Sequence, residues 1–272
     1  MVLHSIFAVF VTTLLLSPHA SGQQQRGQPG WPCVGTVDPT FVSTAEATGG
    51  VVMLLKPTEI AGSAVGLAAS DQHKEVVFRA TGTVADGAYD YEIPLDSTIE
   101  SAYFYLAMQC LRDAALTDPS GDELRADAEG VQSHRFEAVR LFTIAKPAPG
   151  LWKVSVAGRG FFSVIVRAKS DLQLASVTVT DSTGAPDGAP KRQRLEVTIK
   201  GEATDLGFRL LSAAAASIGP LELALEKESD SESTYAGEVT PPTGSFRVAM
   251  TGIDASGFRF QRVDRRLTGS ER

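Results

Sequence analysis

The sequence predicts a mainly β protein, with two consecutive immunoglobulin-like or fibronectin-like β-sandwiches preceded by a short α/β segment. Apolar and other residues alternate in many short runs, so that Phe104, Leu106 and Met108 share one face, as do Trp152 and Val154. Gly or Pro ends most of these runs. Period-two alternation over short runs bounded by turn residues is typical of strands whose inner faces form a shared core.

The first 22 residues predict a secretory signal peptide. Residues 6–16 form an apolar run shorter than the roughly 20 residues that span a bilayer. Pro18 breaks this run, and residues 20–22 are small, as a signal peptidase requires. We therefore expect cleavage near Gly22 and a secreted mature chain, extracellular or periplasmic, with an uncleaved anchor as the alternative. The rest of the chain has no apolar run long enough to cross a membrane, so we expect no span in the mature protein.

Residues 23–35 are polar and Gly-rich and predict a flexible lead-in. Residues 36–72 then predict a helix, a strand and a second helix. Asp38 and Pro39 form a helix-start signal, residues 51–55 form a short apolar strand, and Pro57 opens the second helix, which runs towards Ala69. This segment is too small to fold alone, so we expect it to lie against a sandwich or another chain.

The first sandwich is predicted over residues 73–170 and the second over residues 171–268. Residues 121–134 are acidic and predict a long exposed loop, while residues 226–232 predict a solvated hairpin loop. The strands predicted in the first sandwich are 76–78, 89–93, 102–108, 140–144, 149–156 and 161–166. The strands predicted in the second are 174–180, 195–199, 208–211, 221–225, 235–239, 246–250 and 258–263.

The net charge of the chain disfavours nucleic acid as a partner. The formal charge is -7 and the isoelectric point about 5.2, and an acidic surface repels phosphate backbones. The chain contains no Asn and hence no site for N-glycosylation. We expect the partner to be an extracellular protein or a glycan.

The two cysteines allow two interpretations. In an oxidising compartment Cys33 and Cys110 would form a disulfide, which would stabilise the fold by on the order of 4 kcal/mol in the chain-entropy model. Alternatively, Cys110 is a buried thiol that continues the inward face of its strand and behaves as a small apolar residue.

No catalytic constellation is recognisable in the sequence, and we expect neither an enzyme nor a cofactor. His73 and His134 lie among polar residues in expected loops, and a zinc site needs more ligands at suitable spacing. Oxygen ligands on the acidic loop make Ca²⁺ a candidate against a simple solvated loop. These calcium candidates are Asp118, Asp122, Glu123, Asp127 and Glu129.

Two further features are interpreted as structural, each with a functional alternative. Phe161 and Phe162 beside Trp152 are expected in the core, with an exposed aromatic platform for sugars as the alternative. The basic cluster of Lys191 to Arg194 is expected to be a solvated turn.

Three groups of residues resemble the region that follows the von Willebrand factor A domain in hemicentin-like extracellular proteins. Residues 41–52, with a Thr-Gly-Gly turn, are similar to the last helix-to-strand passage of such an A domain. Residues 118–121, 149–152 and 158–164 are similar to the sandwich after it, and residues 246–262 to the next immunoglobulin-like module.

This resemblance implies a secreted, non-catalytic protein of the binding or adhesion type. The Asp-x-Ser-x-Ser loop through which a functional A domain binds its divalent ion does not occur in this sequence, so the metal-dependent adhesion of that family does not carry over. The alternatives are a carbohydrate-binding module and a secreted hydrolase of unrecognised type.

Overall fold

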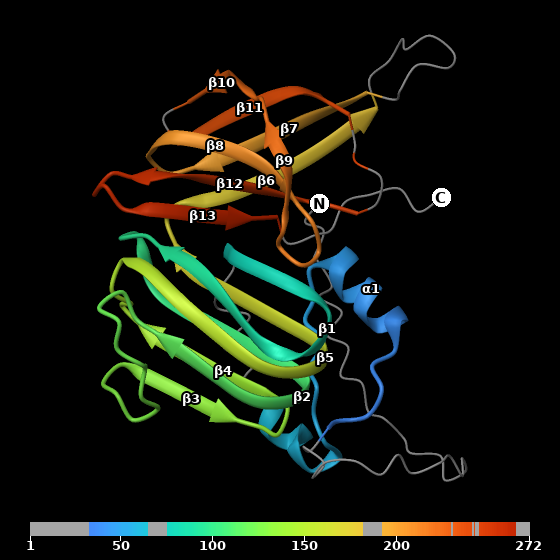
Figure 1. Ribbon diagram of the computed structural model, residues 1–272. Coiled ribbons are helices and arrows are strands. Elements are labelled where there is room, and N and C mark those ends of the chain that lie inside the picture. The colour runs from blue at the N-terminus through green and yellow to red at the C-terminus, as the bar shows by residue number, and fades with distance from the viewer. Residues whose placement is uncertain are drawn as a thin grey trace, which may run out of the picture.

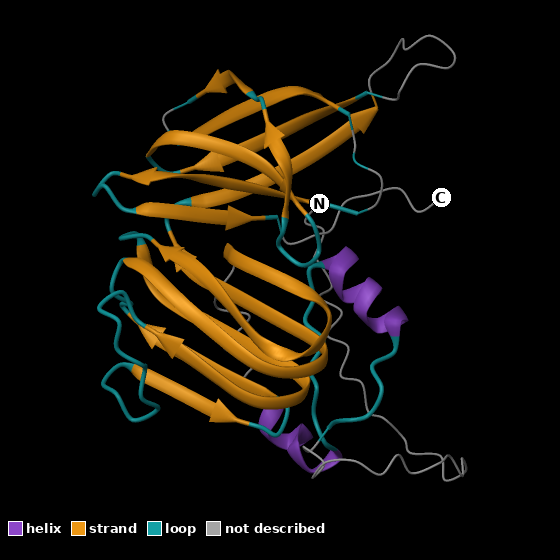
Figure 2. Ribbon diagram, in the orientation of Figure 1, coloured by secondary structure: helices purple, strands orange, loops and turns teal. Residues whose placement is uncertain are grey.

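The computed structural model describes residues 33–64, 75–181, 192–229, 231–240, 242 and 245–264. The expected signal peptide, most of the lead-in and the basic residue Lys191 lie outside these ranges. The mainly β class is confirmed, because antiparallel strands dominate both units (Figures 1 and 2). The helix α1 (Pro39–Thr48) lies beside the first unit, close to its junction with the second.

The first unit is built on one five-stranded antiparallel sheet in the order β1-β5-β2-β4-β3. Its members are β1 (Glu75–Leu95), β2 (Ile99–Thr117), β3 (Val131–Arg135), β4 (Val139–Ala145) and β5 (Gly150–Ser170). Two boundaries differ from the prediction. Residues 76–78 and 89–93 are halves of β1, and residues 149–156 and 161–166 are halves of β5, because pairing continues through bulges where turns were expected. All of β3 except Arg135 also lies within the stretch that was expected to be only loop.

A sharp bend gives this single sheet a two-layered core. Phe78 and Tyr91 lie on the same strand, yet their ring centroids are 5.2 Å apart. In a straight strand their Cα atoms would be separated by roughly 43 Å. The halves of the sheet therefore face each other across a core that includes Phe104, Trp152 and Val164. One bent sheet thus encloses the core for which the sequence predicted two sheets.

Glycine makes the bend possible in β5. Gly158 has φ 148°, and a Cβ atom at this position would lie 2.2 Å from the carbonyl oxygen of Cys110. Gly160 has φ 89°, which is also in the region that side chains disfavour. The opposite strand carries register shifts on both sides of Cys110, so the two strands bend together.

The N-terminal segment covers the outer face of this sheet. Helix α1 begins as predicted, since Asp38 Oδ1 accepts a hydrogen bond from the Thr40 N–H at 2.8 Å, and it ends at Gly49 with φ 73°. The predicted strand over 51–55 is wrong, because this extended chain pairs with no strand among the described residues. The second helix begins at Pro57 as a 3₁₀ turn, η1 (Pro57–Gly62), and residues 65–74 lie outside the described ranges.

Apolar contacts and one covalent bond attach this segment to the sheet. Met53 and Leu54 are buried against the outer face, next to Tyr105, whose hydroxyl donates to the carbonyl oxygen of Val52 at 2.6 Å. Of the two interpretations of the cysteines, the disulfide is confirmed: Cys33 is bonded to Cys110 at the bend of β2. The segment therefore lies in cis on the first unit.

The second unit is a sandwich of two four-stranded sheets, β10-β11-β7-β6 and β13-β12-β8-β9. Its strands are β6 (Gln173–Asp181), β7 (Gln193–Lys200), β8 (Ala203–Leu211), β9 (Ser217–Leu221), β10 (Ala224–Glu228), β11 (Glu232–Val239), β12 (Arg247–Asp254) and β13 (Arg259–Val263). The strand predicted over 221–225 is in fact divided between β9 and β10. The loop predicted from 226 starts too early, because exposed β10 continues to Glu228 by backbone pairing with β11.

Buried polar contacts join the two units. The Arg262 guanidinium forms an ion pair with Asp96 at 2.8 Å, with both side chains fully buried, and donates to Ser170 Oγ at 2.6 Å. Asp254 in the second unit accepts hydrogen bonds from the Ser97 N–H and hydroxyl at 2.8 and 2.6 Å. Because such groups are costly to bury unpaired, these contacts favour one relative orientation of the units.

Candidate functional site: a groove beside helix α1

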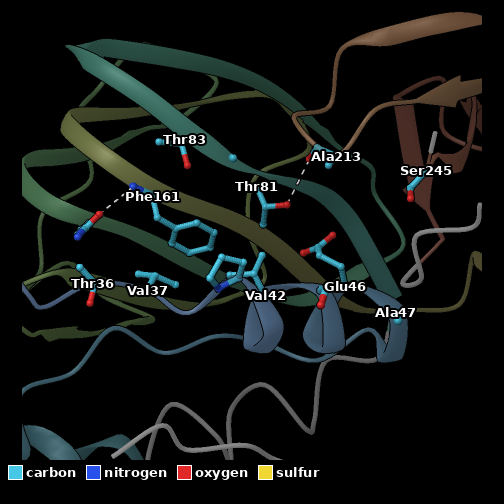
Figure 3. A pocket seen from close by; sticks show the side chains of 14 residues that line it. Thr36, Val37, Val42, Glu46, Ala47, Thr81, Thr83, Phe161, Ala213 and Ser245 are labelled. Carbon is cyan, nitrogen blue, oxygen red and sulfur yellow. Dashed lines mark hydrogen bonds between the residues drawn. The ribbon is translucent and has the colours of Figure 1, made fainter. Parts of the chain in front are cut away.

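A groove of about 860 Å³ lies between helix α1, the β1 edge of the first sheet and the second unit (Figure 3). Its size is within the range of ligand-binding clefts. Its lining residues come from the N-terminal segment, three strands of the first sheet and two loops of the second unit. They are Thr36, Val37, Pro39, Val42, Ser43, Glu46, Ala47, Thr81, Gly82, Thr83, Gln109, Phe161, Ala213 and Ser245.

One wall is a single face of α1. Pro39, Val42, Ser43, Glu46 and Ala47 follow the three- and four-residue spacing that places side chains on the same side of a helix. Of the ten residues of α1, only Glu46 is buried. Pro39, Ser43 and Ala47 of this face are exposed, whereas Val42 packs against the apolar cluster on the outer face of the sheet.

The opposite wall is the outer face of the sheet. Thr81 and Thr83 extend from β1, and the ring of Phe161 on β5 lies beneath them (Figure 3). The side chain of Gln109 is held from two sides: its Oε1 accepts from the Phe161 N–H at 3.3 Å, and its Nε2 donates to the Gly35 carbonyl at 3.1 Å. This wall thus combines an aromatic surface with hydroxyl and amide groups.

A buried charge cluster closes the groove at the second unit. Glu46 Oε1 accepts hydrogen bonds from Arg79 Nη2 at 2.8 Å and Nε at 3.2 Å, and Glu46 Oε2 forms an ion pair with Arg247 of β12. Both arginine side chains are 1% exposed. Burial lowers the pKa of each to about 10, and the nearby charge of Asp264 acts in the opposite direction on the pKa of Arg247.

Glu46 therefore connects the helix to both units. It is the one carboxylate in the lining, and the two guanidiniums occupy both of its oxygens. The other lining groups are hydroxyl, amide, aliphatic and aromatic. Such a surface offers hydrogen-bonding groups and apolar contact area.

The structure does not bring the five calcium candidates together. Asp118 Oδ1 accepts from the Ser120 N–H at 2.9 Å and hydroxyl at 2.6 Å, and this hydroxyl contributes most to lowering the pKa of Asp118. Asp127 is paired with Arg125 at 3.0 Å. Within the described ranges, no group of three or more His, Cys, Asp or Glu side chains is placed to hold a metal ion.

The alternative of an aromatic sugar platform is wrong. Trp152 and Phe162 are 2% and 3% exposed in the inner core, and Phe161 is 7% exposed under the N-terminal segment. The bend in β5 buries aromatic side chains on both faces of the strand, because the inner face folds onto itself and the outer face is covered.

The remaining predicted residues lie away from the groove. His134 is partly exposed on the edge strand β3, and His73 lies outside the described residues. In the basic cluster, Arg194 pairs with Glu196 at 2.9 Å and also with Glu226. The charge of Arg194 is thus compensated by carboxylates of the second unit.

Sequence reasoning missed the groove because its lining comes from distant segments. The one local signal was the small-residue face of α1, from Pro39 to Ala47, which is less apolar than a fully packed helix face.

No helix in the described part of the chain has the length and apolar content that crossing a membrane requires.

Comparisons with known proteins identify no family. No protein-family model and no curated protein matches the chain. Matching solved structures include a Bacillus licheniformis lipase in its propeptide form, with 13% identity over 69% of this chain and a TM-score of 0.33. Another is a Bifidobacterium dentium β-glucuronidase complexed with coumarin-3-O-glucuronide, with 10% identity over 65% of this chain and a TM-score of 0.23. The matches span 40% and 38% of those proteins, and the similarity is too low to indicate function.

Proposed function

We propose that this chain is a secreted, non-catalytic binding protein of the adhesion type, resembling the region after the A domain of hemicentin-like proteins. The observation that carries the proposal is the groove beside α1. Its one carboxylate, Glu46, is held by two arginines, while the exposed hydroxyl groups of Thr36 and Thr83 and the apolar side chains of the lining can contact a ligand.

Two further features support this proposal. The Cys33–Cys110 disulfide fits an oxidising compartment outside the cytosol. The buried ion pair between Arg262 and Asp96 joins the units that form the groove, and a pre-organised site loses less entropy on binding.

The test is a binding screen of the mature chain, residues 23–272, against arrays of extracellular proteins and of glycans. Ser43→Trp fills the groove from an exposed position on α1, and Thr40→Trp adds the same bulk to an exposed position outside the lining. We expect Ser43→Trp to weaken binding at least about tenfold, and Thr40→Trp to leave it unchanged.

Two results would contradict the proposal. One is a ligand whose affinity is equally insensitive to both substitutions, since it would bind elsewhere. The other is turnover of ester or glycoside substrates by the purified chain, which would restore the hydrolase alternative. A glycan ligand that is sensitive to Ser43→Trp would support a binding function of the carbohydrate-binding type.

A further inference from the structure

Resting on the binding function above, we propose that the groove takes an extended peptide segment of a partner protein. The segment adds to the edge strand β1 by backbone hydrogen bonding at Thr83. Two independent features of the groove point to this occupant: the orientation of the β1 backbone and the open face of α1.

The ladder pattern orients the backbone of Thr83. In an antiparallel pair, residues alternate between positions whose N–H and C=O bond to the partner strand and positions where they point away. The Thr81 N–H donates to the Ala213 carbonyl at 2.8 Å, so Thr81 points away from β5. Thr83 is two residues further, in the same register opposite Phe161, and therefore also points away from β5.

The partner strand gives the same result. Thr83 is opposite Phe161, whose N–H donates to Gln109 Oε1 on β2 and hence does not bond to β1. Thr83 and Phe161 thus form a non-hydrogen-bonded pair. The N–H and C=O of Thr83 face the open edge of the sheet, where no partner for them lies among the described residues.

The edge of β1 already forms a backbone hydrogen bond with a segment outside the sheet. Ala213 of the second unit occupies the hydrogen-bonding position at Thr81, and the free position at Thr83 continues directly from it into the groove. An unpaired edge presents the groups that an added strand requires, with a spacing between strands of about 4.8 Å. This is the geometry of peptide recognition by strand addition.

The face of α1 supplies the second half of the site. Val37 and Val42 pack against the apolar cluster that contains Phe161 and line the groove beside it, so an added strand would have an apolar surface for the side chains on one of its faces (Figure 3). Helix α1 and the Ala213 loop flank the edge. The groove between them therefore suits a single extended chain better than a second sheet.

The experiment is a selection from a random linear peptide library displayed on phage, with the mature chain as the target. The affinity of the selected peptides is then measured for two substitutions at Thr83, which is exposed. Thr83→Pro removes the N–H donor at an edge position where proline is tolerated, whereas Thr83→Val keeps the donor and a similar shape. We expect Thr83→Pro to weaken binding about tenfold or more and Thr83→Val to change it little.

Two further measurements keep the test decisive if Thr83→Pro does not fold. Peptides that carry backbone N-methyl groups at alternate positions are expected to lose binding to the unmodified chain. Hydrogen exchange at the Thr83 amide is expected to slow when a peptide is bound, because strand addition protects it.

The outcomes separate this inference from the function on which it rests. If peptides or glycans bind in a manner sensitive to Ser43→Trp, but neither Thr83→Pro nor N-methylation matters, strand addition is overturned and the binding function stands. If the chain instead dimerises through Thr83, the occupant is a second copy and the inference fails. If no peptide, protein or glycan binds, both proposals fail.

Discussion

Removing the carboxylate of Glu46 tests how the groove is held together. The Glu46→Ala substitution leaves Arg79 and Arg247 buried without their shared counter-ion. Burial lowers the pKa of both guanidiniums to about 10, well below the usual range of arginine, so keeping them charged inside the protein is costly. Because the carboxylate offsets much of this cost, we expect Glu46→Ala to lower the free energy of unfolding by about 3–5 kcal/mol.

Urea unfolding measures this change, followed by the fluorescence of the buried Trp152 and by circular dichroism. Coincidence of the two transitions shows whether the two units unfold together. The matched control is Glu232→Ala, which breaks an ion pair with Lys200 whose side chains are 43% and 45% exposed. We expect it to lower the free energy of unfolding by about 1 kcal/mol or less.

Two further variants distinguish charge from packing. Glu46→Gln keeps a hydrogen-bond acceptor for Arg79 but removes the charge, so we expect most of the loss to persist. Replacing Glu46, Arg79 and Arg247 together by Leu, Met and Met is expected to restore part of the stability, because no uncompensated charge remains. A Glu46→Ala variant no less stable than Glu232→Ala would show that Glu46 is not the stabilising counter-ion of the two buried arginines.

Four other predictions address the disulfide, the bend, the junction and the acidic loop. Replacing Cys33 and Cys110 by Ser is expected to lower the free energy of unfolding, measured in urea, by about 4.5 kcal/mol, because the bond closes a loop with a sequence separation of 77. An unchanged free energy of unfolding would contradict a disulfide in the native protein. Gly158→Ala is expected to prevent folding, because its Cβ would lie 2.2 Å from a carbonyl oxygen. The control Gly219→Ala, whose Cβ would have no heavy atom within 4 Å, is expected to fold normally, and circular dichroism compares the two variants. Burial tends to raise the pKa of Asp254, but its hydrogen bonds outweigh this effect and the pKa is lowered. The stabilisation by Asp254 is therefore present above about pH 4 and is lost as the pH falls through the folded-state pKa. Melting temperatures between about pH 2 and 5 are expected to vary less with pH in the Asp254→Asn variant than in the unmodified chain. Excess Ca²⁺ is expected to leave the melting temperature unchanged, and a rise would show that the native protein binds the ion.

The alternation of apolar residues predicted the inner face of the first unit well. Phe104, Leu106 and Met108 lie in one buried cluster with Trp152 and Val164, as their period-two spacing indicated. The start of α1 was equally predictable, because capping depends on neighbouring residues alone. The continuity of β1 and β5 was not, because a glycine pair allows both a turn and a bend, and the choice depends on the strand opposite.

The candidate site was much less predictable than the core. The acidic loop was predicted as a calcium candidate because its carboxylates are close in sequence, yet its residues bond to one another and to Arg125. The groove has no such local signal. Thr83 matters through its backbone, and only the pairing of β1 with β5 reveals which way that backbone faces.

The order of residues was sufficient to establish the mainly β class, the faces that would be buried and the first turn of α1. These features arise from interactions within a few residues, through steric preference, capping and period-two burial. The three-dimensional fold decided that Cys33 and Cys110 pair, which charges surround Glu46, and that the backbone edge at Thr83 borders the groove beside helix α1. Those outcomes depend on contacts between segments that are distant in sequence, and the free energy of such a contact cannot be derived from either segment alone.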